Sequence, residues 1–128
     1  MNKHYDLGFA KVEIHDDYLI NTISEGFVVM PEHNKILLDF VEEHFGDKHF
    51  IYISHRINSY SVNPTVYHET TKIKNLIGMA IVSKNQKQKS LCEIESSFYG
   101  KDLKHFTLIE DALTWKDFLL SRHKKKEE

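Results

Sequence analysis

Residues 50–65 read Phe-Ile-Tyr-Ile-Ser-His-Arg-Ile-Asn-Ser-Tyr-Ser-Val-Asn-Pro-Thr, and the order of elements within them decides the fold. The apolar run Phe50–Ser54 is rich in β-formers and predicts an interior strand. A polar stretch follows, and then Asn63-Pro64 supplies a helix cap and a first-turn residue for a helix that we expect to reach Lys74. A strand that feeds a helix through a polar loop is the repeating unit of a parallel α/β sheet. Ligands bind at such loops because free backbone N–H groups and the helix dipole converge there.

Two extended runs precede this stretch and predict an antiparallel hairpin. Apolar and polar residues alternate over 9–14, and a second extended pattern covers 18–24. The polar pair Asp16-Asp17 separates the two runs and suits a short turn.

A helix is predicted between the hairpin and the interior strand. Pro31 suits a first helical position, and Glu32 behind it complements the helix dipole. Apolar residues then recur at spacings of three and four through Phe45. Gly46 is the expected carboxyl-terminal cap.

The carboxyl-terminal half continues the alternation of strands and helices. Residues 77–82 are almost uniformly apolar, which is typical of a strand covered on both faces. The pattern then predicts an amphipathic helix ending at Gly100, a strand at 105–109 and a closing helix from Glu110. A charged tail, 122–128, ends the chain.

Together these elements predict a single-domain α/β fold over residues 1–121. We expect a mostly parallel sheet of about five strands, with an N-terminal antiparallel hairpin and about four helices. In such sheets, function gathers where the parallel strands end.

Composition narrows the classes of function. The chain has 128 residues, of which 41% are hydrophobic and 28% charged, and a formal net charge of -2. That charge argues against a nucleic-acid partner, whose binders carry a basic excess. A single cysteine, Cys92, excludes an internal disulfide, and no apolar run approaches the length of a membrane helix. We therefore expect a cytoplasmic protein with no integral membrane segment.

Familiar catalytic and metal-binding motifs are missing. The nine histidines are scattered, without the i, i+4 spacing or Cys-x-x-Cys partnership of a zinc site. No Gly-x-Ser-x-Gly elbow, Gly-x-x-x-x-Gly-Lys loop or Gly-x-Gly-x-x-Gly fingerprint is present. We predict no metal, no cofactor and no enzymatic activity.

The candidate site lies where the interior strand ends. Arg56 can hold a carboxylate or phosphate through its planar fork, and His55 can titrate near neutral pH. An alternative is a solvated loop in which Arg56 pairs with a nearby acid and the other polar side chains satisfy backbone groups. The full set of ligand- or partner-binding candidates is Ser54, His55, Arg56, Asn58, Ser59, Tyr60, Ser61 and Asn63.

Five segments follow one another in a recognisable order: the hairpin, the helix after Glu25-Gly26, the Phe50 strand with its Asn58–Ser61 loop, the Met79–Val82 strand and Glu110–Trp115. This order resembles the STAS-like, SpoIIAA-like domains, a family named for sulfate transporters and anti-sigma-factor antagonists. The resemblance covers nearly the whole chain, and it implies a non-enzymatic regulatory or ligand-sensing domain in the bacterial cytosol. The best-known antagonists carry an Asp-Ser-Ser-Gly-like motif that a partner kinase phosphorylates. This chain lacks the acidic residue and the glycine there, so only Ser59 and Ser61 are candidates for phosphorylation.

Two classes of function follow. The leading expectation is a regulatory or ligand-sensing module that binds a protein or a small anionic ligand through the loop after the central strand. The alternative is a small enzyme, or a small-molecule or lipid carrier, with a pocket at the carboxyl-terminal strand ends. That pocket would use His55, Arg56 and Tyr60 together with Tyr67 or His68. Self-association as a homodimer is a further expectation.

Overall fold

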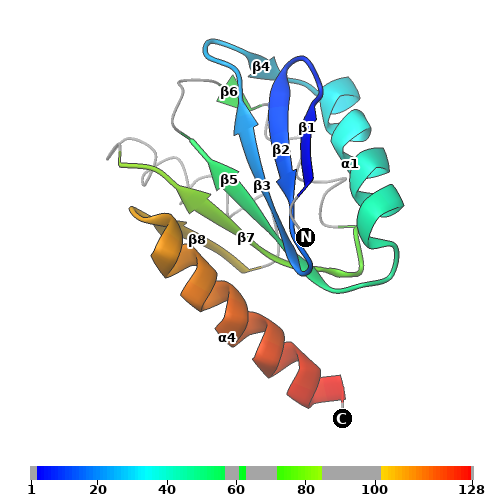
Figure 1. The fold of residues 1–128 in the computed structure, drawn as a ribbon, viewed down its shortest axis with the longest axis vertical. Helices are drawn as coiled ribbons and strands as arrows, with labels where there is room; N and C mark the ends of the chain where they lie inside the picture. The colour runs from blue at the N-terminus through cyan, green and yellow to red at the C-terminus, as the bar shows by residue number, and fades with distance from the viewer. Residues whose placement is uncertain (1–2, 57–60, 63–71, 85–101, 128) are drawn as a thin grey trace.

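A six-stranded sheet forms the centre of the molecule (Figure 1). The computed structural model describes residues 3–56, 61–62, 72–84 and 102–127. The sheet contains, in spatial order, β1 (Lys3–Asp6), β2 (Ala10–Ile14), β3 (Tyr18–Ile23), β5 (Phe50–His55), β7 (Leu76–Val82) and β8 (Asp102–Phe106).

The type of strand pairing changes once across this sheet. β1, β2 and β3 pair antiparallel, whereas β3, β5, β7 and β8 pair parallel. This arrangement confirms the predicted hairpin and the parallel part of the sheet. The prediction of about five strands was short by one, because β1 was not foreseen. Its sequence, Lys-His-Tyr-Asp, is polar with only Tyr5 partly buried, so it carries no apolar period.

A second, two-stranded sheet lies beside the first. β4 (Val28–Val29) pairs parallel with β6 (Ser61–Val62). No strand was predicted at either of these places. Two-residue strands are too short to leave a periodic pattern, which is why neither was predicted.

Helix α1 (Pro31–Phe45) covers one face of the sheet, as predicted. Its buried residues Leu37, Val41 and Phe45 pack with inward-facing residues of β2 and β3. Gly46 ends the helix with a φ of 56°, a left-handed conformation that favours glycine. Its N–H donates to the carbonyl of Glu42 at 3.0 Å.

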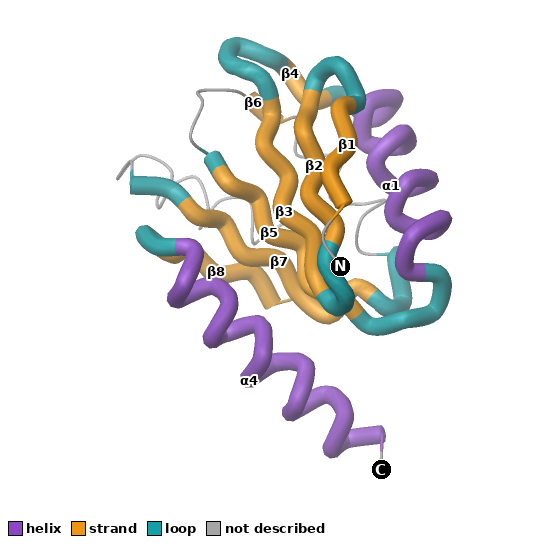
Figure 2. The backbone as a smooth tube through the Cα atoms, viewed as in Figure 1, coloured by secondary structure: helices purple, strands orange, loops and turns teal. Residues whose placement is uncertain are grey.

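Helix α4 (Ile109–Glu127) covers the opposite face, so the two helices lie on different sides of the sheet (Figure 2). Ala112 and Leu119 pack there against residues of β5 and β7. The helix continues through residues 122–127, which the sequence had presented as a charged tail. Arg122 ties this segment to β8, because its Nη2 lies 3.2 Å from Asp102 Oδ2.

Two further boundaries differ from prediction. The last strand is Asp102–Phe106 and not 105–109, because Ile109 already begins α4. Residues 72–75 precede β7 in turns, so the helix expected to reach Lys74 does not extend that far. The described part of the chain contains two helices, against about four predicted. The predicted helix after Asn63 and the predicted helix ending at Gly100 fall largely on residues outside the described part of the chain, as does Cys92.

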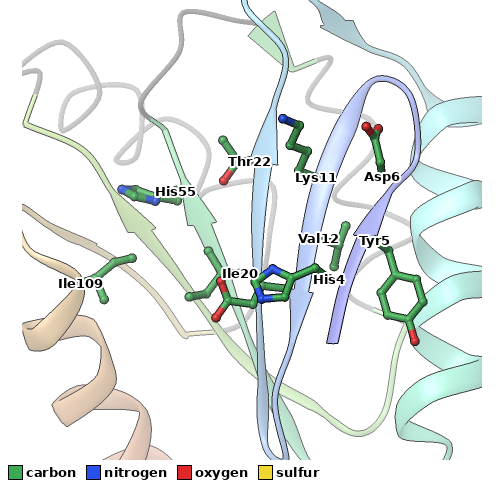
Figure 3. A pocket seen from close by; sticks show the side chains of 10 residues that line it. His4, Tyr5, Asp6, Lys11, Val12, Ile20, Thr22, His55 and Ile109 are labelled. Carbon is green, nitrogen blue, oxygen red and sulfur yellow. The ribbon is translucent and has the colours of Figure 1, made fainter. Parts of the chain in front are cut away.

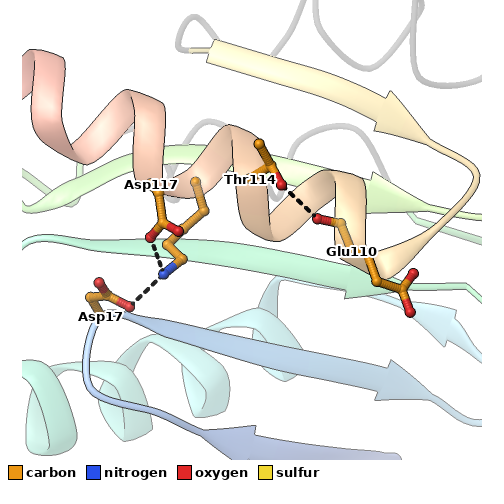
Figure 4. A network of polar contacts seen from close by, with 5 residues as sticks. Asp17, Glu110, Thr114 and Asp117 are labelled. Carbon is orange, nitrogen blue, oxygen red and sulfur yellow. Dashed lines mark hydrogen bonds and ion pairs between the residues drawn. The ribbon is translucent and has the colours of Figure 1, made fainter.

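Lys116 ties α4 to the β2–β3 turn (Figure 4). Its Nζ donates to Asp17 Oδ1 at 3.1 Å and to Asp117 Oδ1 at 2.6 Å, and it lies 4.9 Å from the centre of the Tyr18 ring. Burial disfavours the charged ammonium, but the two carboxylates outweigh it and raise the pKa of Lys116. The lysine is therefore charged at neutral pH despite its burial.

Replacing Lys116 by methionine is expected to lower the free energy of unfolding by about 1–2 kcal/mol, since the apolar stem is kept and the charged hydrogen bonds are lost. Because the folded-state pKa is raised, the contribution is present at neutral pH and disappears only as the pH rises through that value. Urea denaturation of Lys116→Met, with the exposed Lys35→Met as control, measures it. Equal losses in the two variants would contradict the role of Lys116.

Candidate functional site

Strand alternation divides the predicted site between the two faces of the sheet. Ser54 and His55 end β5, and Arg56 follows directly. Successive side chains of a strand point to opposite faces, so Ser54 and Arg56 share one face and His55 takes the other. Arg56 Nε donates to Ser54 Oγ at 3.2 Å, whereas His55 lines a groove with Ile20 and Thr22. Residues that are adjacent in sequence therefore belong to different environments.

Ser54 and Arg56 are packed inside the molecule. Ser54 is 3% exposed and Arg56 is 8% exposed. The backbone N–H of Arg56 donates to the carbonyl of Val82 at 2.9 Å, which extends the β5–β7 pairing by one residue. Arg56 is therefore not solvated, whereas the rest of the solvated-loop alternative rests on residues outside the described part of the chain. This burial also places the guanidinium away from the groove that holds His55.

Asn21 joins these buried polar residues, although it was not among the predicted site residues. It lies opposite Ser54 in the β3–β5 pairing and is 1% exposed. Its Nδ2 donates to the hydroxyl of Tyr52, while its Oδ1 is buried without a hydrogen-bond partner. The signal was an amide at an inward position of β3, between the apolar residues Leu19 and Ile23.

The other face carries a groove of about 470 Å³ over the amino-terminal strands (Figure 3). Ile20 lies in its floor, and Ile109 at the start of α4 borders it. Figure 3 shows side chains from β1, β2, β3 and β5 around the same hollow. The polar side chains that line it are His4, Asp6, Lys11, Glu13, Thr22 and His55.

The strand register orders these polar side chains in a row. Lys11 lies opposite Asp6 on one side and opposite Thr22 on the other. Thr22 and His55 are the residues that follow the Asn21–Ser54 pair, so they continue the row into β5. Lys11, Thr22 and His55 are thus neighbours on three consecutive strands, and all three can donate hydrogen bonds.

A second row across the groove contains a histidine, a carboxylate and an apolar side chain. Glu13 lies opposite His4 on one side and Ile20 on the other. Glu13 Oε1 is 2.5 Å from His15 Nε2, and the ring of His15 stacks on Tyr18 at 4.1 Å between centroids. This pairing turns part of the negative charge of Glu13 away from the row of donors.

Partial burial lowers the pKa of His55 below the ordinary histidine value. The neutral imidazole therefore predominates at neutral pH and presents one N–H donor and one acceptor. An anion bound beside it would favour the protonated form.

The rest of the predicted recognition loop is described only in part. Ser61 lies in β6, where it pairs with Val28. Residues 57–60 and 63–71 lie outside the described part of the chain. That includes the binding candidates Asn58, Ser59, Tyr60 and Asn63, and Tyr67 and His68 of the alternative pocket. Phosphorylation of Ser59 or Ser61 stays a prediction.

Metal-binding clusters and membrane-crossing helices are both absent from the described residues. Within residues 3–56, 61–62, 72–84 and 102–127, no three His, Cys, Asp or Glu side chains group closely enough to hold a metal ion. Neither described helix combines the length and the apolar character that a membrane-crossing segment needs.

Comparison with known proteins identifies a relative in fold. No family model matches the chain, and neither does any curated protein. A solved structure does match: the crystal structure of an uncharacterized protein from the DUF3478 family, with a SpoIIAA-like fold, from Shewanella loihica PV-4. The two are 15% identical, the match covers 91% of this chain and 95% of that one, and the TM-score is 0.56. The chain has a SpoIIAA-like fold, as the resemblance in its sequence predicted.

Proposed function

We propose that the chain is a non-enzymatic, ligand-sensing module that binds a small anionic ligand in the groove beside the start of α4, over β1, β2 and β3. The observation that carries the proposal is the row formed by Lys11, Thr22 and His55, which aligns an ammonium, a hydroxyl and an imidazole on three neighbouring strands. These groups suit a carboxylate or a phosphate, whose oxygens accept hydrogen bonds from all three.

The surrounding charges favour a ligand of low charge. Asp6 lies opposite Lys11, and Glu13 lies on the same face of the same strand as Lys11. Their carboxylates repel a polyanion such as a nucleic acid, in keeping with the formal net charge of -2. A protein that presents a single acidic side chain would use the same donors.

The positions of His55 and Arg56 support binding in preference to catalysis at a strand-end pocket. His55 lines the groove, whereas Arg56 packs with Ser54 on the other side of the sheet. These two residues therefore do not converge as the alternative of a strand-end pocket requires. A hollow that stays open to water also lacks the exclusion of solvent that strengthens catalytic electrostatics.

Titration of the isotope-labelled chain with inorganic sulfate and inorganic phosphate, at constant ionic strength, tests the site. We expect NMR shifts at Lys11, Thr22 and His55, and about a tenfold loss of affinity in Lys11→Met because a charged hydrogen bond is removed. Lys35→Met on α1 removes the same positive charge but lies outside the groove. This control should bind the anion as the parent chain does.

The sulfate titration also has a predicted pH dependence. Affinity should rise as the pH falls through the lowered pKa of His55, since protonation adds a positive charge and a second donor. His55→Gln should remove this rise while it preserves binding near neutral pH. Anion-induced shifts that avoid all three residues, or an affinity unchanged in Lys11→Met, would refute the assignment.

A further inference from the structure

Strand β1 leaves one edge of the sheet open within the described part of the chain. It is the outermost strand beside β2, and its residues Lys3, His4 and Asp6 are exposed. Tyr5 instead turns to the other face, where its ring packs against Phe40 at 4.8 Å between centroids. The strand is thus anchored by one side chain and exposed along its outer border.

The backbone groups that face outward can be identified from the hydrogen-bond pattern. The N–H of Leu7 donates to the carbonyl of Ala10 at 2.8 Å, which closes the β1–β2 turn. Hydrogen-bonded pairs alternate along an antiparallel ladder, so the Tyr5–Val12 pair is the next to exchange both bonds. The N–H and C=O groups of His4 and Asp6 therefore point away from β2, toward the free edge.

These outward groups are complementary to a second copy of the same strand. A two-fold axis perpendicular to the sheet, midway between Tyr5 and the partner's Tyr5, sets His4 opposite the partner's Asp6 and Asp6 opposite the partner's His4. Both pairs then fall at hydrogen-bonding positions of the new ladder. Directly opposite side chains share a face, so an imidazole meets a carboxylate twice on the groove side.

Apolar surface on α1 continues beyond the edge on the other face. Phe40 and His44 both contact Tyr5, at 4.8 and 4.9 Å between ring centroids. Ile36 lies four residues before Phe40 on the same helical stripe and is 49% exposed. Four strand residues alone make a small interface, and the exposed Ile36 offers apolar surface next to it.

From this self-complementary edge we propose that a second copy of the chain docks on β1 and joins the two sheets into one. The two grooves then lie side by side across the seam, because His4 and Asp6 line each of them. A ligand in one groove would lie close to the charges of the other copy. Pairing of the two β1 edges does not depend on which ligand the groove binds.

Sedimentation equilibrium over a wide range of concentration tests the dimer. Among the backbone groups, His4→Pro removes only an outward N–H, so the β1–β2 ladder is retained. Each copy loses one backbone hydrogen bond and its imidazole–carboxylate pair, and we expect dimerisation about tenfold weaker or more. Circular dichroism should show an unchanged fold. A wild-type chain that is monomeric throughout would overturn the proposal.

A mixing experiment tests the pairing itself. His4→Glu sets two acids against each other across the seam, and Asp6→Lys sets a lysine against an imidazole, so each variant alone should be monomeric. An equal mixture pairs the new glutamate with the new lysine and leaves one native pair, so it should dimerise. If the mixture stays monomeric while both chains are folded, or if each variant dimerises as the parent does, the pairing is wrong.

Discussion

Replacing Phe50 by alanine is expected to lower the free energy of unfolding by about 3–5 kcal/mol. Phe50 is 0% exposed at the start of β5, and its ring stacks on that of Phe45 at 4.4 Å between centroids. The stack joins the end of α1 to the middle of the sheet. Because β5 is held by β3 on one side and β7 on the other, the cavity left by the ring has little room to collapse.

Urea denaturation followed by circular dichroism measures this loss. Phe118→Ala is the matched control, since Phe118 on α4 is 60% exposed and lies beside Arg122 at 5.5 Å. The control should cost about 1 kcal/mol or less, because little apolar area is removed from the interior. Similar losses in the two variants would show that the Phe45–Phe50 stack does not hold α1 to the sheet.

Replacing Gly78 by valine is expected to lower the free energy of unfolding by about 1–3 kcal/mol or more through overpacking. A Cβ at this position would lie 3.0 Å from Leu119 Cδ1 and 3.1 Å from the carbonyl oxygen of Asp102. The leucine tip can turn aside, but the β8 backbone cannot. Gly78 thus permits the close approach of α4, which also brings Ile109 to the border of the groove.

A graded series separates these two contacts. Gly78→Ala should cost less than Gly78→Val, because it adds only the Cβ that meets Leu119 and the Asp102 carbonyl, whereas valine adds two further methyl groups. Adding Leu119→Ala should relieve part of the valine cost in a double-mutant cycle. Strictly additive losses, or a Gly78→Val variant as stable as the parent, would contradict close packing of α4 on β7.

Local pattern was sufficient for the elements with strong signals. The alternating residues before and after Asp16-Asp17 gave β2 and β3, and the Pro31 and Gly46 boundaries gave α1. Each of these signals acts within a few residues and needs no distant partner. β1 was not predicted, because an exposed edge strand with a single partly buried side chain shows almost no alternation of apolar and polar residues.

The candidate site was predicted less well than the fold. Ser54, His55 and Arg56 were treated as one loop cluster because they follow each other in sequence. β5 continues through His55, so alternation sends Ser54 and Arg56 to one face and His55 to the other. The groove neighbours of His55 are Lys11 and Thr22, which lie on other strands and more than thirty positions away in the sequence.

The sequence by itself determined the class of fold: an antiparallel hairpin leading into a parallel α/β sheet, with α1 capped at both ends. Those features depend on local periodicity and on the backbone preferences of proline and glycine. The tertiary structure alone decided which polar side chains meet. Strand order and register bring Lys11, Thr22 and His55 into one row and leave His4 and Asp6 at an open edge, because cross-strand neighbours are set by pairing between distant segments.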